Sequence, residues 1–162
     1  MRTLDVLDGI AASVETEEAV EEDVAKILDF LRWFADAHHQ VKEETILFPA
    51  LRRASASQGR PVEHLLVEHE QERSAVEDLE TDLRLSRRKE FVAEANQLSS
   101  KLRNHIYKED RILFETANAI LDPTEDSAVL QNLKSFETEF DNQVLEDKLK
   151  DLRRMERIYL RK

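Results

Sequence analysis

Two stretches of this chain are nearly the same: residues 39–48 read HQVKEETILF and residues 105–114 read HIYKEDRILF. Six of the ten aligned positions are identical. Each stretch places a histidine four residues before a glutamate, a spacing that puts both side chains on one face of a helix. Each then runs into Ile-Leu-Phe, which indicates a buried face. Because a buried carboxylate is costly unless a cation meets it, the repeat predicts a metal ion shared between two helices.

The composition of the chain favours a single, nearly all-helical domain. Its 162 residues include only two glycines and three prolines, and the abundant Leu, Glu, Ala, Arg and Lys are good helix formers. A chain of this length has room for one real core. It contains no cysteine, which excludes disulfides, thiolate metal sites and iron–sulfur clusters. Any metal would therefore be held by nitrogen and oxygen ligands.

The charge and hydropathy of the chain argue against two classes of partner. A net charge of −11 is opposite to the basic surface that general nucleic-acid binding requires. No apolar run approaches the roughly 18 residues of a membrane-spanning helix, and no secretory signal precedes the first helix. We therefore expect a cytoplasmic protein that binds neither nucleic acid nor membrane.

The spacing of apolar residues and the positions of helix-breaking residues predict five helices. Pro61 fits the first turn of the third, and Pro49 would kink or end the second. Asp122, Pro123 and Glu125 look like the start of the last helix. The predicted helices cover residues 3–14, residues 23–54, Pro61 to a break near Ser86, residues 89–121 and residues 123–160.

Four of these helices complete a bundle, which leaves the last one outside it. The expected fold is all-α: an antiparallel up-down four-helix bundle over residues 1–121, with an additional amphipathic C-terminal helix within residues 122–162. That helix must pack on the outside of the bundle or form a homodimer interface. The apolar stripe of the fourth helix is Phe91, Ala95, Leu98, Leu102, His105, Glu109 and Ile112. The stripe of the last is Leu133, Phe136, Phe140, Val144, Leu149, Leu152 and Met155.

The repeated histidine–glutamate pairs form the candidate metal site. If the second and fourth helices are neighbours, His39 with Glu43 can approach His105 with Glu109 across the core. His69, in the apolar stripe of the third helix, can supply a third imidazole at a similar depth. Three imidazoles with two carboxylates suit iron, manganese or zinc, and the two carboxylates can bridge a pair of ions.

Simpler interpretations compete with the metal site at each residue. A lone His69 is more often a hydrogen-bonded core histidine, and one His-x-x-x-Glu can be an ordinary side-chain pair. The duplication, with a third histidine in a stripe, favours metal. His38 is expected to pack beside the site, and His64 to be exposed. The aromatic side chains of Phe30, Trp33 and Phe34 are interpreted as core.

With these residues in view, the chain resembles the hemerythrin-like (HHE cation-binding) family over about residues 3–121. The resemblance rests on Phe34-Ala-Asp-Ala-His-His39, Lys42-Glu-Glu44 before Leu47-Phe-Pro49, Glu68-His69-Glu70 with Arg73, and His105 with Glu109. It implies an antiparallel bundle around a non-haem di-iron centre that Glu43 and Glu109 would bridge. It also implies that the ligand is O2 or another small molecule, such as peroxide or nitric oxide.

One departure from the family pattern concerns the first helix, which in relatives gives another histidine. This chain reads Met1-Arg2-Thr3-Leu4 where that histidine would stand. Either the ligand lies upstream of Met1, or the site has one imidazole fewer. We do not assign Asp5 or Asp8 as its substitute. The last helix lies outside the family core.

The expected function is to bind, store or sense O2 or a related small molecule at non-haem iron, as a pair of ions, with zinc and manganese as the other suitable metals. Two alternatives stay open. An incomplete site leaves more coordination positions free, which favours an iron-dependent enzyme reacting with peroxide or nitric oxide. A bundle that no longer holds metal would serve as an interaction module through its long last helix.

Overall fold

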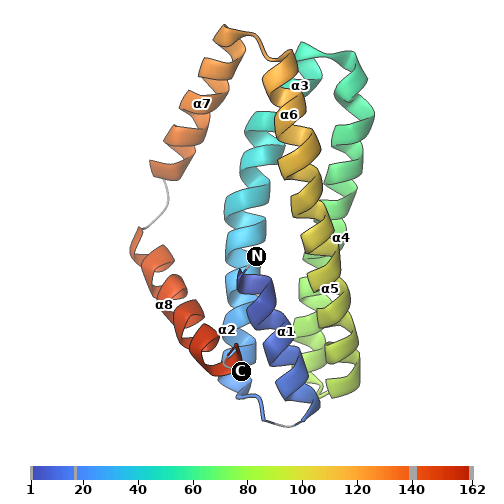
Figure 1. Cartoon of the computed structure of the whole chain (residues 1–162), viewed down its shortest axis with the longest axis vertical. Coiled ribbons are helices and arrows are strands. Elements are labelled where there is room, and N and C mark those ends of the chain that lie inside the picture. The colour runs from blue at the N-terminus through green and yellow to red at the C-terminus, as the bar shows by residue number, and fades with distance from the viewer. Residues whose placement is uncertain (1, 17, 139–141, 161–162) are drawn as a thin grey trace.

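The computed structural model describes residues 2–16, 18–138 and 142–160, and they form an antiparallel four-helix bundle followed by two further helices (Figure 1). Three rods of the bundle are α1 (Arg2–Glu15), α4 (Gly59–Arg84) and the run of α5 (Arg88–Lys108), η4 (Glu109–Leu113) and α6 (Phe114–Ile120). The other rod joins α2 (Glu21–Leu31), η1 (Arg32–Gln40), η2 (Glu43–Leu47) and α3 (Phe48–Ala54). A short turn, η3 (Ala56–Gln58), connects α3 to α4. The expected fold class is confirmed.

Both long rods contain π-helical turns, and two of these turns begin at the glutamates of the repeat. The N–H of Phe48 reaches the carbonyl of Glu43, and the N–H of Phe114 reaches that of Glu109. Such i→i+5 bonds take an extra residue into the turn and are frequent at functional sites. Pro49 follows directly, in the first turn of α3, where its missing N–H is tolerated. The helical rod therefore continues through Pro49.

The extra residue shifts which side chains face the core. Ile112 was expected in the buried stripe of the fourth helix, but its side chain is 58% exposed, while Leu113 is 5% exposed. The prediction for Ile112 was wrong because it assumed an unbroken 3.6-residue period, which the turn starting at Glu109 interrupts.

Two apolar clusters fill the bundle, one toward each end. The first joins α1, α2, α4 and α5, with Leu7, Ile27 and Phe91 fully buried. The second joins η2, α3, the start of α4, and α6, with Leu51 and Val62 fully buried. Along α4 and the α5–α6 rod, the histidines of interest lie between these clusters. Packing in the two clusters thus sets how the rods are aligned along the bundle axis.

The C-terminal region is two helices, α7 (Pro123–Thr138) and α8 (Asn142–Tyr159), where one was expected. The predicted start is confirmed: Asp122 Oδ1 accepts the N–H groups of Thr124 and Glu125, both at 2.8 Å, and the N–H of Asp122 donates to Glu125 Oε2 at 3.1 Å. Phe140, expected in the apolar stripe, lies outside the described residues.

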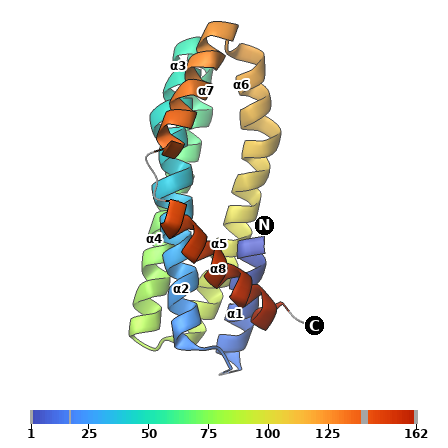
Figure 2. The same cartoon turned by 90° about the vertical axis from the view of Figure 1, so that its left-hand side faces the viewer.

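The helix α8 crosses the outer face of α1 and α2 (Figure 2). Its Leu152 and Met155 are buried in the first apolar cluster. The carboxylate of Asp23 on α2 accepts hydrogen bonds from Arg154 and, at 3.0 Å, from the hydroxyl of Tyr159. Leu152 and Met155 therefore pack within their own chain, whereas Val144 and Ile158 of the same helix are exposed. Among the described residues, no helix has both the length and the apolar content that crossing a bilayer requires.

Candidate metal centre

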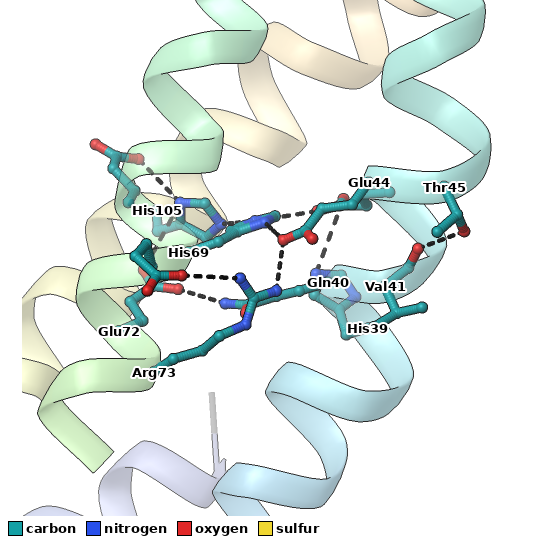
Figure 3. Close-up of polar contacts among 12 residues, drawn as sticks. His39, Gln40, Val41, Glu44, Thr45, His69, Glu72, Arg73 and His105 are labelled. Atoms are coloured by element: carbon teal, nitrogen blue, oxygen red, sulfur yellow. Dashed lines mark hydrogen bonds and ion pairs between the residues drawn. The ribbon is translucent and has the colours of Figure 1, made fainter. Parts of the chain in front are cut away.

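Four side chains from three rods of the bundle converge between the two apolar clusters. They are Glu43, His69, His105 and Glu109, and one nitrogen or oxygen atom from each lies within 4.8 Å of the others. All four side chains are buried. Figure 3 shows His69 and His105 next to one another, on α4 and α5. Four of the five predicted residues therefore meet at one point.

The two carboxylates divide their oxygens between different imidazoles. The Oε2 atom of Glu43 lies 3.5 Å from Nε2 of His69, and its Oε1 lies 3.9 Å from Nε2 of His39. Likewise, Oε1 of Glu109 lies 2.8 Å from Nε2 of His105, and its Oε2 lies 3.4 Å from Nε2 of His39. His39, whose side chain is 35% exposed, therefore approaches the far oxygens of both glutamates.

Each buried imidazole is held in place by a carboxylate on its other nitrogen. Glu44 lies 2.8 Å from Nδ1 of His69, and Glu68 lies 2.9 Å from Nδ1 of His105. Glu44 also pairs with Arg73 (Figure 3), and Glu68 with a lysine of α5, Lys108. A carboxylate at Nδ1 fixes the orientation of the ring and leaves Nε2 pointing inward, as in metal-ligating histidines.

A buried amide–carboxylate pair lies beside these imidazoles. Nε2 of Gln40 donates to Oε2 of Glu72 at 2.7 Å (Figure 3), and Oε1 of Glu72 lies 3.7 Å from Nδ1 of His105. Burial raises the pKa of Glu72. This pair therefore joins η1 to α4 next to His105.

The electrostatics of the cluster favour a cation. Neither carboxylate oxygen of Glu43 has a hydrogen-bond partner, and burial raises the pKa of this group. Burial also opposes a charge on His69, but the carboxylates of Glu109, Glu43 and Glu44 outweigh it and raise the pKa of His69 to about 10. A buried carboxylate without donors is costly. The donor set, imidazole nitrogen with carboxylate oxygen, suits a divalent transition metal that would supply the missing charge.

The remaining histidines lie away from the centre. Nε2 of His38 lies 3.0 Å from Oε2 of Glu137 on α7, and its ring stacks on Trp33 at 5.6 Å. This is the packing role expected for it. The side chain of His64 is exposed, as expected, and lies 3.1 Å from Glu68. Phe34 is 39% exposed, so its assignment to the core was wrong.

Sequence reasoning did not assign roles to the supporting carboxylates Glu44, Glu68 and Glu72. A usable signal was present for two of them, because Glu44 directly follows Glu43 and Glu68 directly precedes His69. An acid next to an inward-facing ligand can reach the partner helix from the edge of the helical face.

A cavity of about 290 Å³ lies next to the centre, on the side of His39. Its polar lining includes His39, Gln40, Glu72 and Glu109. The N-terminal turn of α1 contributes Thr3 and Leu4. The other apolar lining residues are Phe30, Leu31, Phe34, Leu102, Ile106 and Phe114. The cavity gives a small molecule room beside the candidate metal ligands.

Comparison with known proteins identifies one family. The model of the hemerythrin HHE cation binding domain matches residues 1–117. No curated protein and no solved structure matches the chain. The matched residues include all the side chains of the candidate centre.

Proposed function

The chain belongs to the hemerythrin HHE cation-binding family, and from this premise we propose that it holds non-haem iron and uses it to bind, store or sense O2 or a related small molecule. The buried histidine and glutamate group fits a metal-binding protein of this family. The proposed ligands are His39, Glu43, His69, His105 and Glu109.

The division of the carboxylate oxygens is the observation that carries the proposal. One position for an ion is bounded by the Nε2 atoms of His69 and His105 and by the nearer oxygens of Glu43 and Glu109. A second position is bounded by Nε2 of His39 and the far oxygens of the same glutamates. Two carboxylates that serve both positions can bridge a pair of ions.

When bound, non-haem iron supplies a redox-active ion with open coordination positions for a small ligand. The chain supplies the surroundings. Glu44 and Glu68 orient the imidazoles, and Leu47 and Leu113, both buried, keep water from that end of the site. The cavity beside His39 gives the ligand access from one side.

Elemental analysis of the untagged chain, expressed with ample iron, tests the proposal. We expect close to two irons per chain. Glu43→Ala and Glu109→Ala each remove oxygens from both positions and should lose most of the iron. Glu70→Ala, at an exposed glutamate on α4, is the matched control and should keep it. Iron content unchanged in both test variants would contradict the proposed ligands.

An iron-dependent reaction with peroxide or nitric oxide is the second candidate function. It is favoured by the second position, where the proposed ligands are one imidazole, that of His39, and the far oxygens of Glu43 and Glu109, and which adjoins the cavity. Under this hypothesis, peroxide consumption by the iron-loaded chain survives purification and disappears in His105→Ala. Consumption that persists in that variant would come from a contaminant or free iron.

A further inference from the structure

One side of the cavity beside His39 is a wall of aromatic rings. The rings of Phe30 and Phe34 stack at 5.6 Å with an interplanar angle of 19°, and those of Phe34 and His39 stack at 6.4 Å and 5°. All three residues line the cavity. These three nearly parallel rings on α2 and η1 line the cavity, and aromatic side chains of this kind interact favourably with another ring, face to face or edge to face.

The rod formed by α5, η4 and α6 lines the cavity with Leu102, Ile106 and Phe114. These side chains are apolar, so this part of the lining forms few hydrogen bonds with water. The aromatic lining and this apolar lining lie on different rods, so a planar apolar group in the cavity can contact both.

The volume exceeds what a diatomic molecule needs. The cavity measures about 290 Å³, whereas an apolar protein cavity of about 150 Å³ is sufficient to bind benzene. A single water takes only about 30 Å³ of the liquid. The space therefore fits a one-ring organic molecule.

The polar end of the cavity offers acceptors. Gln40 is 2% exposed; its amide nitrogen donates to Glu72, and its Oε1 has no hydrogen-bond partner. The carboxylates of Glu72, Glu109 and Asp110 also line the cavity. This arrangement favours a ligand that donates a hydrogen bond, and it repels an anion.

The side chains of Phe34 and Phe114 are 39% and 40% exposed. Large apolar side chains that are exposed around a cavity are a common feature of binding sites. We propose that this cavity binds a single-ring aromatic molecule carrying one hydrogen-bond donor, with its ring against Phe34 and its donor directed to Gln40.

Calorimetric titration of the full chain with phenol tests this site, in the zinc-loaded state and after removal of metal with a chelator. We expect a dissociation constant of about 1 mM or tighter in both states. Toluene lacks the donor, cyclohexanol lacks the flat ring, and benzoate is an anion; each should bind at least about tenfold more weakly. Equal affinity for toluene or cyclohexanol, or no phenol binding, would overturn the proposal. Binding only with zinc would also overturn it, because phenol would then be a metal ligand.

Cavity-filling variants locate the binding. Ile106→Phe should weaken phenol binding at least about tenfold, because the larger side chain takes up part of the cavity volume. Ile112→Phe is the matched control, since Ile112 is on the same rod but 58% exposed and should leave the affinity unchanged. If Ile106→Phe does not fold, Phe34→Leu removes one ring of the wall and should weaken binding about fivefold. Unchanged affinity in a folded test variant contradicts the site. Because the chelated chain is included, failure to find iron would leave this result standing.

Discussion

Nε2 of His69 lies 3.1 Å from Nε2 of His105, while the Nδ1 atoms of both rings face carboxylates on neighbouring helices. The two rings meet edge to face, with centroids 4.9 Å apart. Apolar packing on both sides, together with Glu44 and Glu68, holds this arrangement. Two inward-facing nitrogens at this distance can share a cation, or form one hydrogen bond with each other when one ring carries the proton.

The carboxylate behind His69 should tune metal affinity without being a ligand. Glu44→Gln removes the charge that orients the ring and should weaken metal binding by about 10–100-fold. Competition with a chromophoric zinc chelator measures the change. Glu70→Gln is the control, because Glu70 also pairs with Arg73 but is exposed. An affinity equal to that of the parent chain would show that Glu44 does not orient His69.

His39 should decide whether a second ion binds. Its Nε2 lies 3.9 Å from Oε1 of Glu43 and 3.4 Å from Oε2 of Glu109, so the proposed second position has one imidazole where the first has two. We expect the ions to bind in two steps, the second weaker, and His39→Ala to remove only the second. Zinc calorimetry measures both. Loss of both steps in this variant would mean that His39 serves a common site.

The attachment of α8 should make stability depend on pH in acid. The hydrogen bond from Arg154 lowers the pKa of Asp23, so Asp23 binds its proton less readily in the folded chain than in the unfolded one. The stabilisation is complete above the unfolded pKa of about 4. It is lost as the pH falls through the lower folded value.

Asp23→Asn should therefore lower the free energy of unfolding at pH 7 by about 1–3 kcal/mol, and the difference from the parent should vanish in strong acid. Urea denaturation across a pH series measures it. Asp29→Asn, on the same helix as Asp23, breaks the pair with Lys148 of α8; because the side chain of Asp29 is 68% exposed, it should cost less than about 1 kcal/mol. A deficit for Asp23→Asn that does not shrink with acid would rule out the charge as its cause.

Gly9 marks the close contact between α1 and α8. A Cβ atom there would lie 2.8 Å from the carbonyl oxygen of Tyr159 and 3.1 Å from its Cβ, so Gly9→Ala forces α8 to move. We expect a loss of about 1–3 kcal/mol in unfolding free energy, measured by urea denaturation. Gly59→Ala, with nothing within 4 Å of the added atom, should not destabilise. Equal effects of the two changes would show that α8 is loosely held.

The helical bundle and the burial of its histidines could be predicted, because each follows from the sequence of one helix at a time. The spacing of apolar residues identifies the buried face of a helix, and this spacing placed His69, His105 and Glu109 on such a face. The start of α7 at Asp122 follows from local hydrogen bonds of the same kind. These features need no knowledge of the neighbouring helix.

The errors arise where the helical period changes, or where a contact depends on how one helix is rotated about its axis relative to the next. Ile112 was misplaced because the π-helical turn at Glu109 adds a residue. The pairing of Glu44 with His69 and of Gln40 with Glu72 joins different rods, and spacing along one helix says nothing about rotation of the next. The division into α7 and α8 was missed because the apolar stripe continues across both.

The shared carboxylates have a consequence for how such a centre can change over generations. A substitution at Glu43 or Glu109 alters both positions at once, since each residue faces an imidazole on either side. In the proposed centre each imidazole serves a single position: His39 serves one, and His69 and His105 serve the other. In the evolution of a new metal or ligand preference, His39 is therefore the least constrained of these residues. Its loss would leave the buried position at His69 and His105 intact.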